Sequence, residues 1–191
     1  MADTAATQRP DALIDKDDGR NYWSSIDADD NGMLGGYPQV SREDLLGSRA
    51  FLAKLGIGLR NGRRRVKRVL EGGAGIGRIT RGLLLPIADT VDLIEPIAKF
   101  TDALREVPGV GSIHNVGLEE WAPQEGVQYD LVWTQWCVGH LTDEQLVDYL
   151  KLCATVLEPK TGLIVIKENL ISSGVDEFDD VDSSVTRYVL R

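Results

Sequence analysis

The stretch Val69-Leu-Glu-Gly-Gly-Ala-Gly-Ile-Gly-Arg78 identifies the fold of this chain. Residues 66–71 form a short apolar segment that predicts a strand, and residues 76–85 predict a helix that Pro86 stops. The glycines between them suit a turn with unusual backbone angles, in which the main chain approaches a ligand closely. A strand, a glycine turn and a helix in this order are typical of a nucleotide-binding α/β domain.

The rest of the chain continues the alternation of strands and helices. Further strands are predicted at residues 91–95, 112–116, 129–134 and 163–167. The helix after the fourth strand is predicted to begin at Thr142, with Gln145 in the capping-box position. Because strands that alternate with helices pair in parallel through right-handed crossovers, we expect a Rossmann-like, doubly wound α/β sheet. Its ligands should bind beyond the carboxyl ends of the strands.

Three regions are expected along the chain. Residues 1–20 contain few large apolar groups and predict a disordered leader. Residues 21–62 predict a helical cap and substrate loop, in which Ser41 caps a helix and Asp44 follows in a box-like position. Residues 63–191 then form the ligand-binding domain.

The composition limits the classes of function. The chain has 191 residues, 42% of them hydrophobic, which suits one globular domain. Its net charge of −9 argues against binding to nucleic acid or anionic membranes, and favours either a cationic partner or merely high solubility. No apolar run approaches the roughly 20 residues that span a bilayer, and the N-terminal region lacks the apolar core of a signal peptide. Cys137 and Cys153 lack zinc-ligand spacing, so no metal site is expected, and their small number suits a reducing compartment.

The spacing of the glycines and two charged residues indicate the ligand. In hydride-transfer enzymes the third glycine of the turn falls where Arg78 stands here, and a G-x-G-x-G turn preceded by an acid, Glu71, suits a methyl donor better. Glu95 ends the second predicted strand, near the roughly 20-residue offset at which an acid binds ribose hydroxyls, although it would also begin a helix favourably. The helix dipole disfavours Arg78 in the first helical turn, so a ligand carboxylate would explain its presence. We therefore expect S-adenosylmethionine as the ligand.

Five motifs, in this order, resemble those of the protein N-terminal (α-amino) methyltransferases. They are Gly32-Met-Leu-Gly-Gly-Tyr37, Gly75-Ile-Gly-Arg-Ile-Thr80, Trp133-Thr-Gln-Trp136, Gly139-His-Leu-Thr-Asp143 and Asp179-Asp-Val-Asp-Ser-Ser184. The resemblance extends from Tyr22 to Arg187. It implies a class I enzyme that uses S-adenosylmethionine and releases S-adenosylhomocysteine. Its substrates would be the free α-amino groups of proteins that begin X-Pro-Lys or X-Pro-Arg after loss of the initiator methionine, ribosomal proteins among them.

The resemblance also implies roles for individual residues. Asn169 would bind the backbone of the first substrate residue, Trp136 would pack against the proline, and Asp179 would bind the lysine or arginine at position three. His140 and Asp182 would be the catalytic residues near the amine. The remaining implied contacts to the acceptor are Leu34, Gly35 and Ser184, and those to the donor are Gly73, Gly75, Arg78, Glu95, Leu118, Glu119 and Gln135.

The chemistry of amine methylation agrees with these roles. An α-amino group titrates near about 7.7–8.0, and transfer needs its neutral lone pair, so Asp182 or His140 must remove or direct a proton. Purely structural roles stay open for these residues. The acidic run at residues 176–182 would also suit a solvated loop, and His140 would also suit a loop residue that is hydrogen-bonded to the backbone. We expect Trp133 in the core and Trp136 in the pocket, because the strand ends between them.

Two departures from the family pattern qualify the resemblance. Glu119 stands where the family usually has glutamine, so contacts to adenine would differ. Only five strands are predicted where the family has seven, so the sheet is expected to be truncated after the fifth strand. Two alternative functions follow: a small-molecule methyltransferase of the same fold, and a donor-binding module without activity.

We expect a monomer in the cytoplasm. The basic cluster Arg63-Arg-Arg-Val-Lys-Arg68 fits either a nuclear address, which would add the nucleus as a second location, or the solvated start of the first strand.

Overall fold

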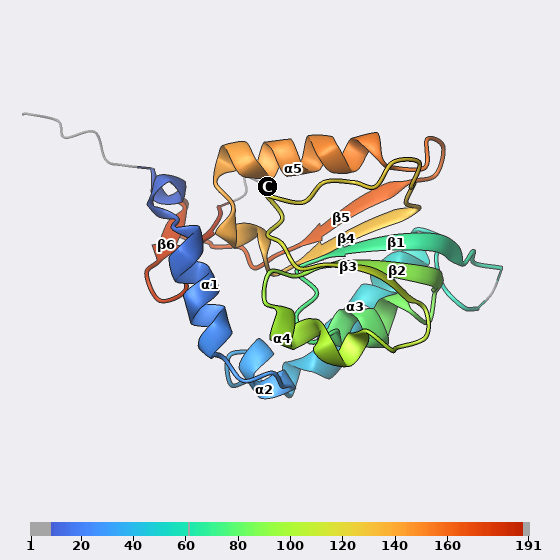
Figure 1. Cartoon of the computed structure of the whole chain (residues 1–191), viewed down its shortest axis with the longest axis horizontal. Coiled ribbons are helices and arrows are strands. Elements are labelled where there is room, and N and C mark those ends of the chain that lie inside the picture. Colours follow the sequence, from blue (N-terminus) through green and yellow to red (C-terminus); the bar gives the residue numbers. More distant parts are fainter. Residues whose placement is uncertain (1–8, 61, 189–191) are drawn as a thin grey trace, which may run out of the picture.

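The computed structural model describes residues 9–60 and 62–188, and its centre is a parallel sheet of five strands (Figure 1). Every neighbouring pair of strands in this sheet is parallel. The spatial order is β3-β2-β1-β4-β5, which confirms the predicted doubly wound α/β sheet. The strands are β1 (Val66–Gly72), β2 (Ala88–Ile94), β3 (Val110–His114), β4 (Leu131–Gln135) and β5 (Leu163–Lys167).

The glycine turn follows the central strand of this order. From β1 the chain extends to β2 and β3 on one side and to β4 and β5 on the other. The carboxyl end of β1 is therefore the topological switch point, where open α/β sheets bind their ligands.

Apolar side chains fill the space on both faces of the sheet. Along β4, Leu131 and Trp133 belong to one buried cluster and Val132 to another, because successive residues of a strand point to opposite faces. The strand is buried at every position, as a strand covered on both faces must be.

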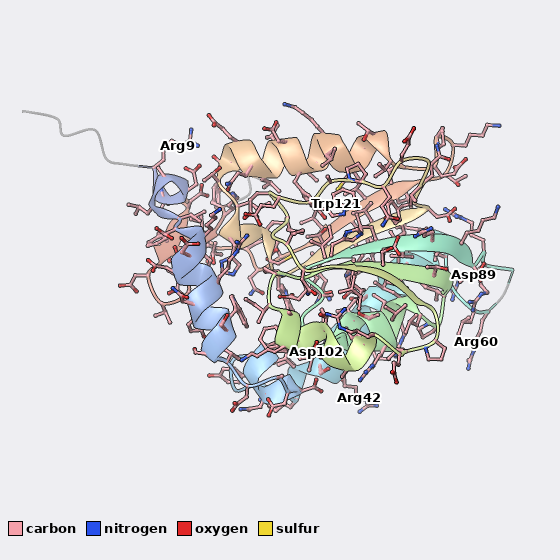
Figure 2. The ribbon with its side chains drawn as sticks, in the orientation of Figure 1. Arg9, Arg42, Arg60, Asp89, Asp102 and Trp121 are labelled. Atoms are coloured by element: carbon pink, nitrogen blue, oxygen red, sulfur yellow. The ribbon has the colours of Figure 1, made fainter. Side chains whose placement is uncertain are left out.

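Helices cover the two faces separately. α5 (Asp143–Thr155) lies on one face, and α3 (Val40–Lys54) and η2 (Thr80–Leu84) lie on the other (Figure 1). In Figure 2, Trp121 lies between α5 and the sheet. The capping box predicted for α5 is confirmed, because the side chains of Thr142 and Gln145 each accept a hydrogen bond from the other residue's backbone N–H.

Two helix starts differ from the prediction. α3 begins at Val40, before the predicted cap Ser41, and Gln39 occupies the cap position without a side-chain hydrogen bond. The side chain of Asp44, expected to support that cap, is engaged in the site described below. In η2 the N–H of Leu85 donates to the carbonyl of Thr80, five residues earlier, at 2.9 Å, so this helix is a wider turn than the predicted α-helix.

The predicted disordered leader at residues 1–20 is wrong for residues 9–20. The structure orders this segment as η1 (Pro10–Leu13) and α1 (Lys16–Ser25). Asp15 caps α1 by accepting hydrogen bonds from two backbone N–H groups of its first turn. Residues 1–8 lie outside the part of the chain that the structure describes.

Ion pairs attach α1 to the loop that follows β3. The guanidinium of Arg20 lies 3.0 Å from Glu119 and 2.7 Å from Glu120, and the ammonium of Lys16 lies 3.2 Å from Glu120. Apolar content could not reveal this segment as ordered, because charged groups make these contacts.

Short elements complete the fold. β6 and β7 pair as an antiparallel hairpin, in addition to the five strands that were predicted. Within the described ranges, no helix is long and apolar enough to cross a membrane. The short elements are α2 (Asp30–Met33), α4 (Ala98–Thr101), η3 (Asp102–Leu104), η4 (Val138–His140), β6 (Glu177–Asp179) and β7 (Ser184–Thr186).

Candidate active site

A cavity of about 170 Å³ lies at the carboxyl ends of β1, β2 and β4, beside α1. The structure brings together here all seven residues predicted to contact the methyl donor, with Trp136 and His140 from the predicted acceptor side. The predicted residues that line it are Gly73, Gly75, Arg78, Glu95, Leu118, Glu119, Gln135, Trp136 and His140.

All three glycines of the turn have positive φ angles, and the first and third of them also lie against neighbouring side chains. Gly73 and Gly77 have φ angles of +69° and +82°, in the left-handed region that other residues rarely adopt. A Cβ atom at Gly73 would also lie 2.5 Å from the Sγ of Cys137, and one at Gly77 would lie 2.4 Å from Leu104. The turn is thus held close to its neighbours, with its backbone toward the cavity.

Glu95 lies at the end of β2 and is only 6% exposed. One carboxylate oxygen accepts from the N–H of Gly75 at 2.8 Å and the other from that of Ile97 at 2.9 Å. Burial raises the pKa of Glu95, and these two hydrogen bonds oppose the rise. Each oxygen keeps a second lone pair, so the fixed carboxylate can still accept from ribose hydroxyls.

Arg78 lines the cavity and has a hydrogen-bond partner that was not predicted. Its Nη1 donates to Asp44 of α3 at 2.5 Å. The amide of Gln135 donates to both oxygens of the same carboxylate, at 2.9 and 3.0 Å, and the Lys167 ammonium also contacts it. Neither Asp44, expected only in a helix cap, nor Lys167 was predicted as a site residue. A signal for Asp44 was present in the sequence. Its spacing from the buried Leu52 puts both residues on one face of the helix, so a carboxylate lies on the apolar stripe.

Trp136 follows β4 in a strained conformation. Its φ angle of +55° is uncommon for a residue with a side chain, and such strain often accompanies a functional site. Its ring lies against two cations, 5.1 Å from Arg78 and 5.8 Å from Lys167. Trp133 is 1% exposed in the core, so the two tryptophans lie in the core and in the cavity as predicted.

The two predicted catalytic residues lie beside each other. The Nε2 atom of His140 is 3.9 Å from the nearer oxygen of Asp182, whose other oxygen accepts from the hydroxyl of Ser184 at 2.6 Å. The indole N–H of Trp23 in α1 donates to the same Nε2 atom at 3.0 Å. Trp23 was missed because its partner is 117 residues away in the chain.

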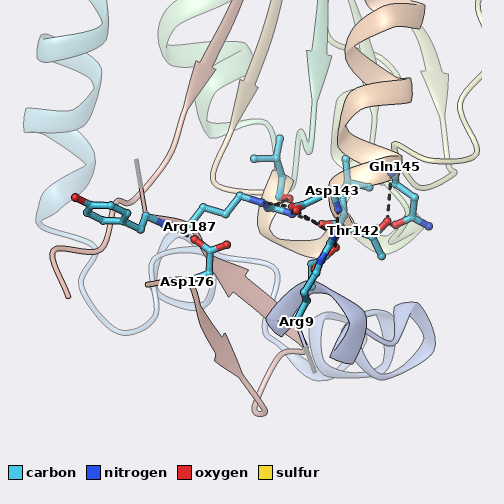
Figure 3. Close-up of polar contacts among 10 residues, drawn as sticks. Arg9, Thr142, Asp143, Gln145, Asp176 and Arg187 are labelled. Atoms are coloured by element: carbon cyan, nitrogen blue, oxygen red, sulfur yellow. Dashed lines mark hydrogen bonds and ion pairs between the residues drawn. The ribbon is translucent and has the colours of Figure 1, made fainter. Parts of the chain in front are cut away.

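A group of polar contacts around Arg187 and Asp143 holds the end of the β6–β7 hairpin against the start of α5 (Figure 3). Arg187, just after β7, donates to the carbonyls of Val138 and Leu141 at 3.0 and 2.7 Å, and pairs with Asp143. Glu168, which follows β5, accepts from the N–H groups of Cys137 and Val138. The short helix that carries His140 is therefore fixed from two sides.

Other predicted acceptor residues lie outside the cavity lining. Asp179, in β6, is exposed, and its carboxylate accepts from the N–H of Val181 at 2.9 Å. Asn169 and Gly35 are exposed and Leu34 is half-buried, whereas the neighbouring Met33 does line the cavity. These roles stay predictions.

The cavity fits S-adenosylmethionine. A fixed carboxylate after β2 suits its ribose, the backbone of the glycine turn lies at the switch point, and the guanidinium of Arg78 suits its carboxylate. Fold and site together define a class I methyltransferase.

Comparisons with known proteins identify the family. The sequence model of the AdoMet dependent proline di-methyltransferases matches residues 11–190, and the chain belongs to this family. It is 44% identical to N-terminal Xaa-Pro-Lys N-methyltransferase 1 of Danio rerio, over 87% of this chain and 75% of that protein. It is 42% identical to alpha N-terminal protein methyltransferase 1 of Schizosaccharomyces pombe, over 89% of this chain and 77% of that protein.

Comparison with solved structures also gives a methyltransferase fold. A SAM-dependent methyltransferase of Leishmania major is similar with a TM-score of 0.78 and 36% identity, over 89% of this chain and 66% of that one. Phosphoethanolamine N-methyltransferase 1 of Haemonchus contortus, solved with S-adenosylhomocysteine, has a TM-score of 0.61 at 22% identity, over 88% of this chain and 34% of that one, and shows the fold alone.

Proposed function

We propose that the protein transfers a methyl group from S-adenosylmethionine to the free α-amino group of proteins that begin X-Pro-Lys or X-Pro-Arg. The observation that supports this most is the position of His140, which lines the donor cavity 3.9 Å from Asp182 in the turn of the acidic β6–β7 hairpin. The relative from Danio rerio is named an N-terminal Xaa-Pro-Lys N-methyltransferase, and that from Schizosaccharomyces pombe an alpha N-terminal protein methyltransferase.

The residues at the donor end of the site bind and orient S-adenosylmethionine. Glu95 holds the ribose, Leu118 and Glu119 lie at the adenine, and Arg78 with Gln135 lies at the amino-acid end. When bound, S-adenosylmethionine supplies the methyl group from its sulfonium.

The acceptor end prepares the amine. An α-amino group is largely protonated below about pH 7.7, and only its neutral lone pair can form the new N–C bond. Asp182 accepts the departing proton. His140 lies beside it with its Nε2 lone pair engaged by the Trp23 N–H, so it can take a proton only when that hydrogen bond breaks. Ser184 orients Asp182 through the hydrogen bond to its carboxylate.

Substrate choice depends on the residues around this pair. Trp136 packs against the proline at position two, and Asn169 binds the backbone of the first residue. Asp179 attracts the cationic side chain at position three, and the loop with Leu34 and Gly35 closes over the peptide. Ribosomal proteins with this N-terminus are candidate substrates.

We propose that the enzyme acts as a cytoplasmic monomer that does not bind nucleic acid. The net charge of −9 supports the last point. Arginines of the basic cluster are engaged within the fold: Arg65 donates to two backbone carbonyls, and Arg68 pairs with Asp92 at 2.7 Å. These contacts favour a structural role for the cluster over a nuclear address.

Mass spectrometry of peptides tests the proposed function. We expect an Ala-Pro-Lys peptide incubated with the protein and S-adenosylmethionine to gain methyl groups on its α-amine. The same peptide with an acetylated N-terminus, and an Ala-Pro-Glu peptide, serve as controls and should stay unmodified. Methylation of the lysine ε-amine, or of simple amines without preference for this sequence, would contradict the proposal.

A further inference from the structure

Asp44 connects four elements of the fold at one carboxylate. We call Asp44, Arg78, Gln135 and Lys167 the Asp44 cluster. They come from α3, the helix after the glycine turn, the end of β4 and the end of β5, and every contact among them is made to Asp44. The side chains of Asp44 and Arg78 are 4% and 10% exposed, whereas that of Lys167 is 32% exposed, so the carboxylate is buried and the network reaches the surface at Lys167.

The cluster carries one net positive charge. Burial opposes ionisation of Asp44, but hydrogen bonds from Lys167, Arg78 and Gln135 outweigh it and hold its pKa below the ordinary value. One carboxylate thus faces two cations, Arg78 and Lys167. The surplus charge lies next to the cavity, where it favours an anionic group of a ligand.

The geometry leaves part of Arg78 available to that group. Within the described residues, Asp44 is the only hydrogen-bond partner of the Arg78 guanidinium and uses its Nη1 alone. The other guanidinium nitrogens keep their donors, and a planar fork of this kind suits a carboxylate. Gln135 is oriented from both ends, since its amide nitrogen donates to Asp44 and its oxygen accepts from Trp133 at 3.1 Å.

The same carboxylate also places a cation on the acceptor side. Lys167 contacts Asp44 and Ser48, and its ammonium lies 5.8 Å from the ring centre of Trp136. Arg78 lies 5.1 Å from the same ring. The Asp44 cluster therefore lies behind the part of the cavity wall that Arg78, Gln135 and Trp136 form.

We propose that Asp44 is a positioning residue, which orients Arg78 and Gln135 toward the amino-acid end of the methyl donor and holds Lys167 against Trp136. The identity of the donor and of the acceptor side rests on the proposed function. Asp44 itself need not touch either ligand.

A purely electrostatic role makes the opposite prediction. If Asp44 only competed with the ligand for Arg78, its removal would raise the local positive charge and strengthen binding of a carboxylate. If it positions Arg78 and Gln135, replacement by asparagine would weaken binding, because the new amide N–H₂ would face groups that are themselves donors.

Calorimetry with two ligands separates these roles. S-Adenosylhomocysteine has the amino-acid end, whereas methylthioadenosine shares its adenine, ribose and thioether but lacks that end. We expect Asp44→Asn to weaken binding of S-adenosylhomocysteine by about tenfold, the loss of one charge-assisted contact, and to change binding of methylthioadenosine by less than about twofold. Glu43→Gln, an exposed charge change next to Asp44 in α3, should affect neither ligand.

Tighter binding of S-adenosylhomocysteine, or equal weakening of both ligands, would overturn the positioning role. If thermal unfolding shows that Asp44→Asn does not fold, Asp44→Glu decides, because it keeps the charge but displaces the carboxylate. Selective weakening of S-adenosylhomocysteine in Asp44→Glu supports the role, and unchanged or unselective binding contradicts it. Wild-type protein that binds S-adenosylhomocysteine without methylating peptides would contradict the proposed function and leave this test valid.

Discussion

The indole N–H of Trp23 donates a hydrogen bond to Nε2 of His140 at 3.0 Å. This contact links α1 to the short helix η4 and brings a segment near the N-terminus into the candidate active site. Because Nε2 accepts this hydrogen bond, it is the imidazole nitrogen that has the lone pair.

Replacement of Trp23 by phenylalanine tests this contact. The phenyl ring keeps most of the packing but removes the donor, so His140 loses its orientation. We expect kcat for an Ala-Pro-Lys peptide to fall about tenfold, less than the roughly 100-fold or more that an acid–base group itself contributes, because Trp23 only orients His140. Tyr22→Phe is the matched control, because Tyr22 packs edge-on against Trp23 without a bond to His140. Equal loss of kcat in the two variants would show that the hydrogen bond is not the cause.

Glu71 makes the stability of the protein depend on pH. It is 2% exposed, and burial raises its pKa to about 8 although the Thr80 hydroxyl donates to it. The folded protein therefore keeps this proton over a pH range in which the unfolded chain, with a pKa near about 4.3, has lost it. Stability from this group is fully present below about pH 4 and is lost as the pH rises through the folded value.

Glu71→Gln should remove this dependence, because glutamine stays neutral. We expect the free energy of unfolding of the wild type, relative to the variant, to fall by about 3–4 kcal/mol between pH 5 and pH 8. Urea unfolding at the two pH values measures it, with the exposed Glu43→Gln as the control. A constant difference across this range would mean that Glu71 is ionised throughout.

Two glycine substitutions separate backbone strain from steric contact. Gly73 and Gly126 have similar φ angles of +69° and +75°, but a Cβ at Gly126 meets nothing within 4 Å, whereas one at Gly73 meets Cys137. We expect Gly126→Ala to cost about 1 kcal/mol of stability and Gly73→Ala about 2–4 kcal/mol. Thermal unfolding of both variants measures this, and equal destabilisation would mean that the turn can move away from Cys137.

Local patterns predicted most of the fold. The alternation of strands and helices determined the sheet, and the Thr142 capping box was found where its residues lie three apart. The leader was misread because α1 is docked by ion pairs such as Arg20 with Glu120, which carry no apolar signal. The start of α3 was misplaced because Ser41 and Asp44 resemble a cap but lie inside the helix.

Only those residues of the candidate site that belong to a sequence motif could be predicted. Arg78 and Glu95 belong to a known strand–turn–helix pattern and lie in the cavity. Asp44 and Trp23 reach the site from separate helices, so only tertiary packing brings them there. A charged residue on the buried stripe of a helix, such as Asp44, is the kind of sequence signal that can indicate these residues.

Single-turnover methylation of an Ala-Pro-Lys peptide by Asp182→Asn tests the central claim most directly. The substitution removes the proposed proton acceptor but keeps an oxygen for the Ser184 hydroxyl. Asp180→Asn makes the same change in charge at an exposed position of the same hairpin and is the control. We predict that Asp182→Asn slows transfer by about 100-fold or more, with affinity for S-adenosylhomocysteine within about twofold of the wild type. A transfer rate close to that of Asp180→Asn, or an equal loss of donor affinity, would contradict the account.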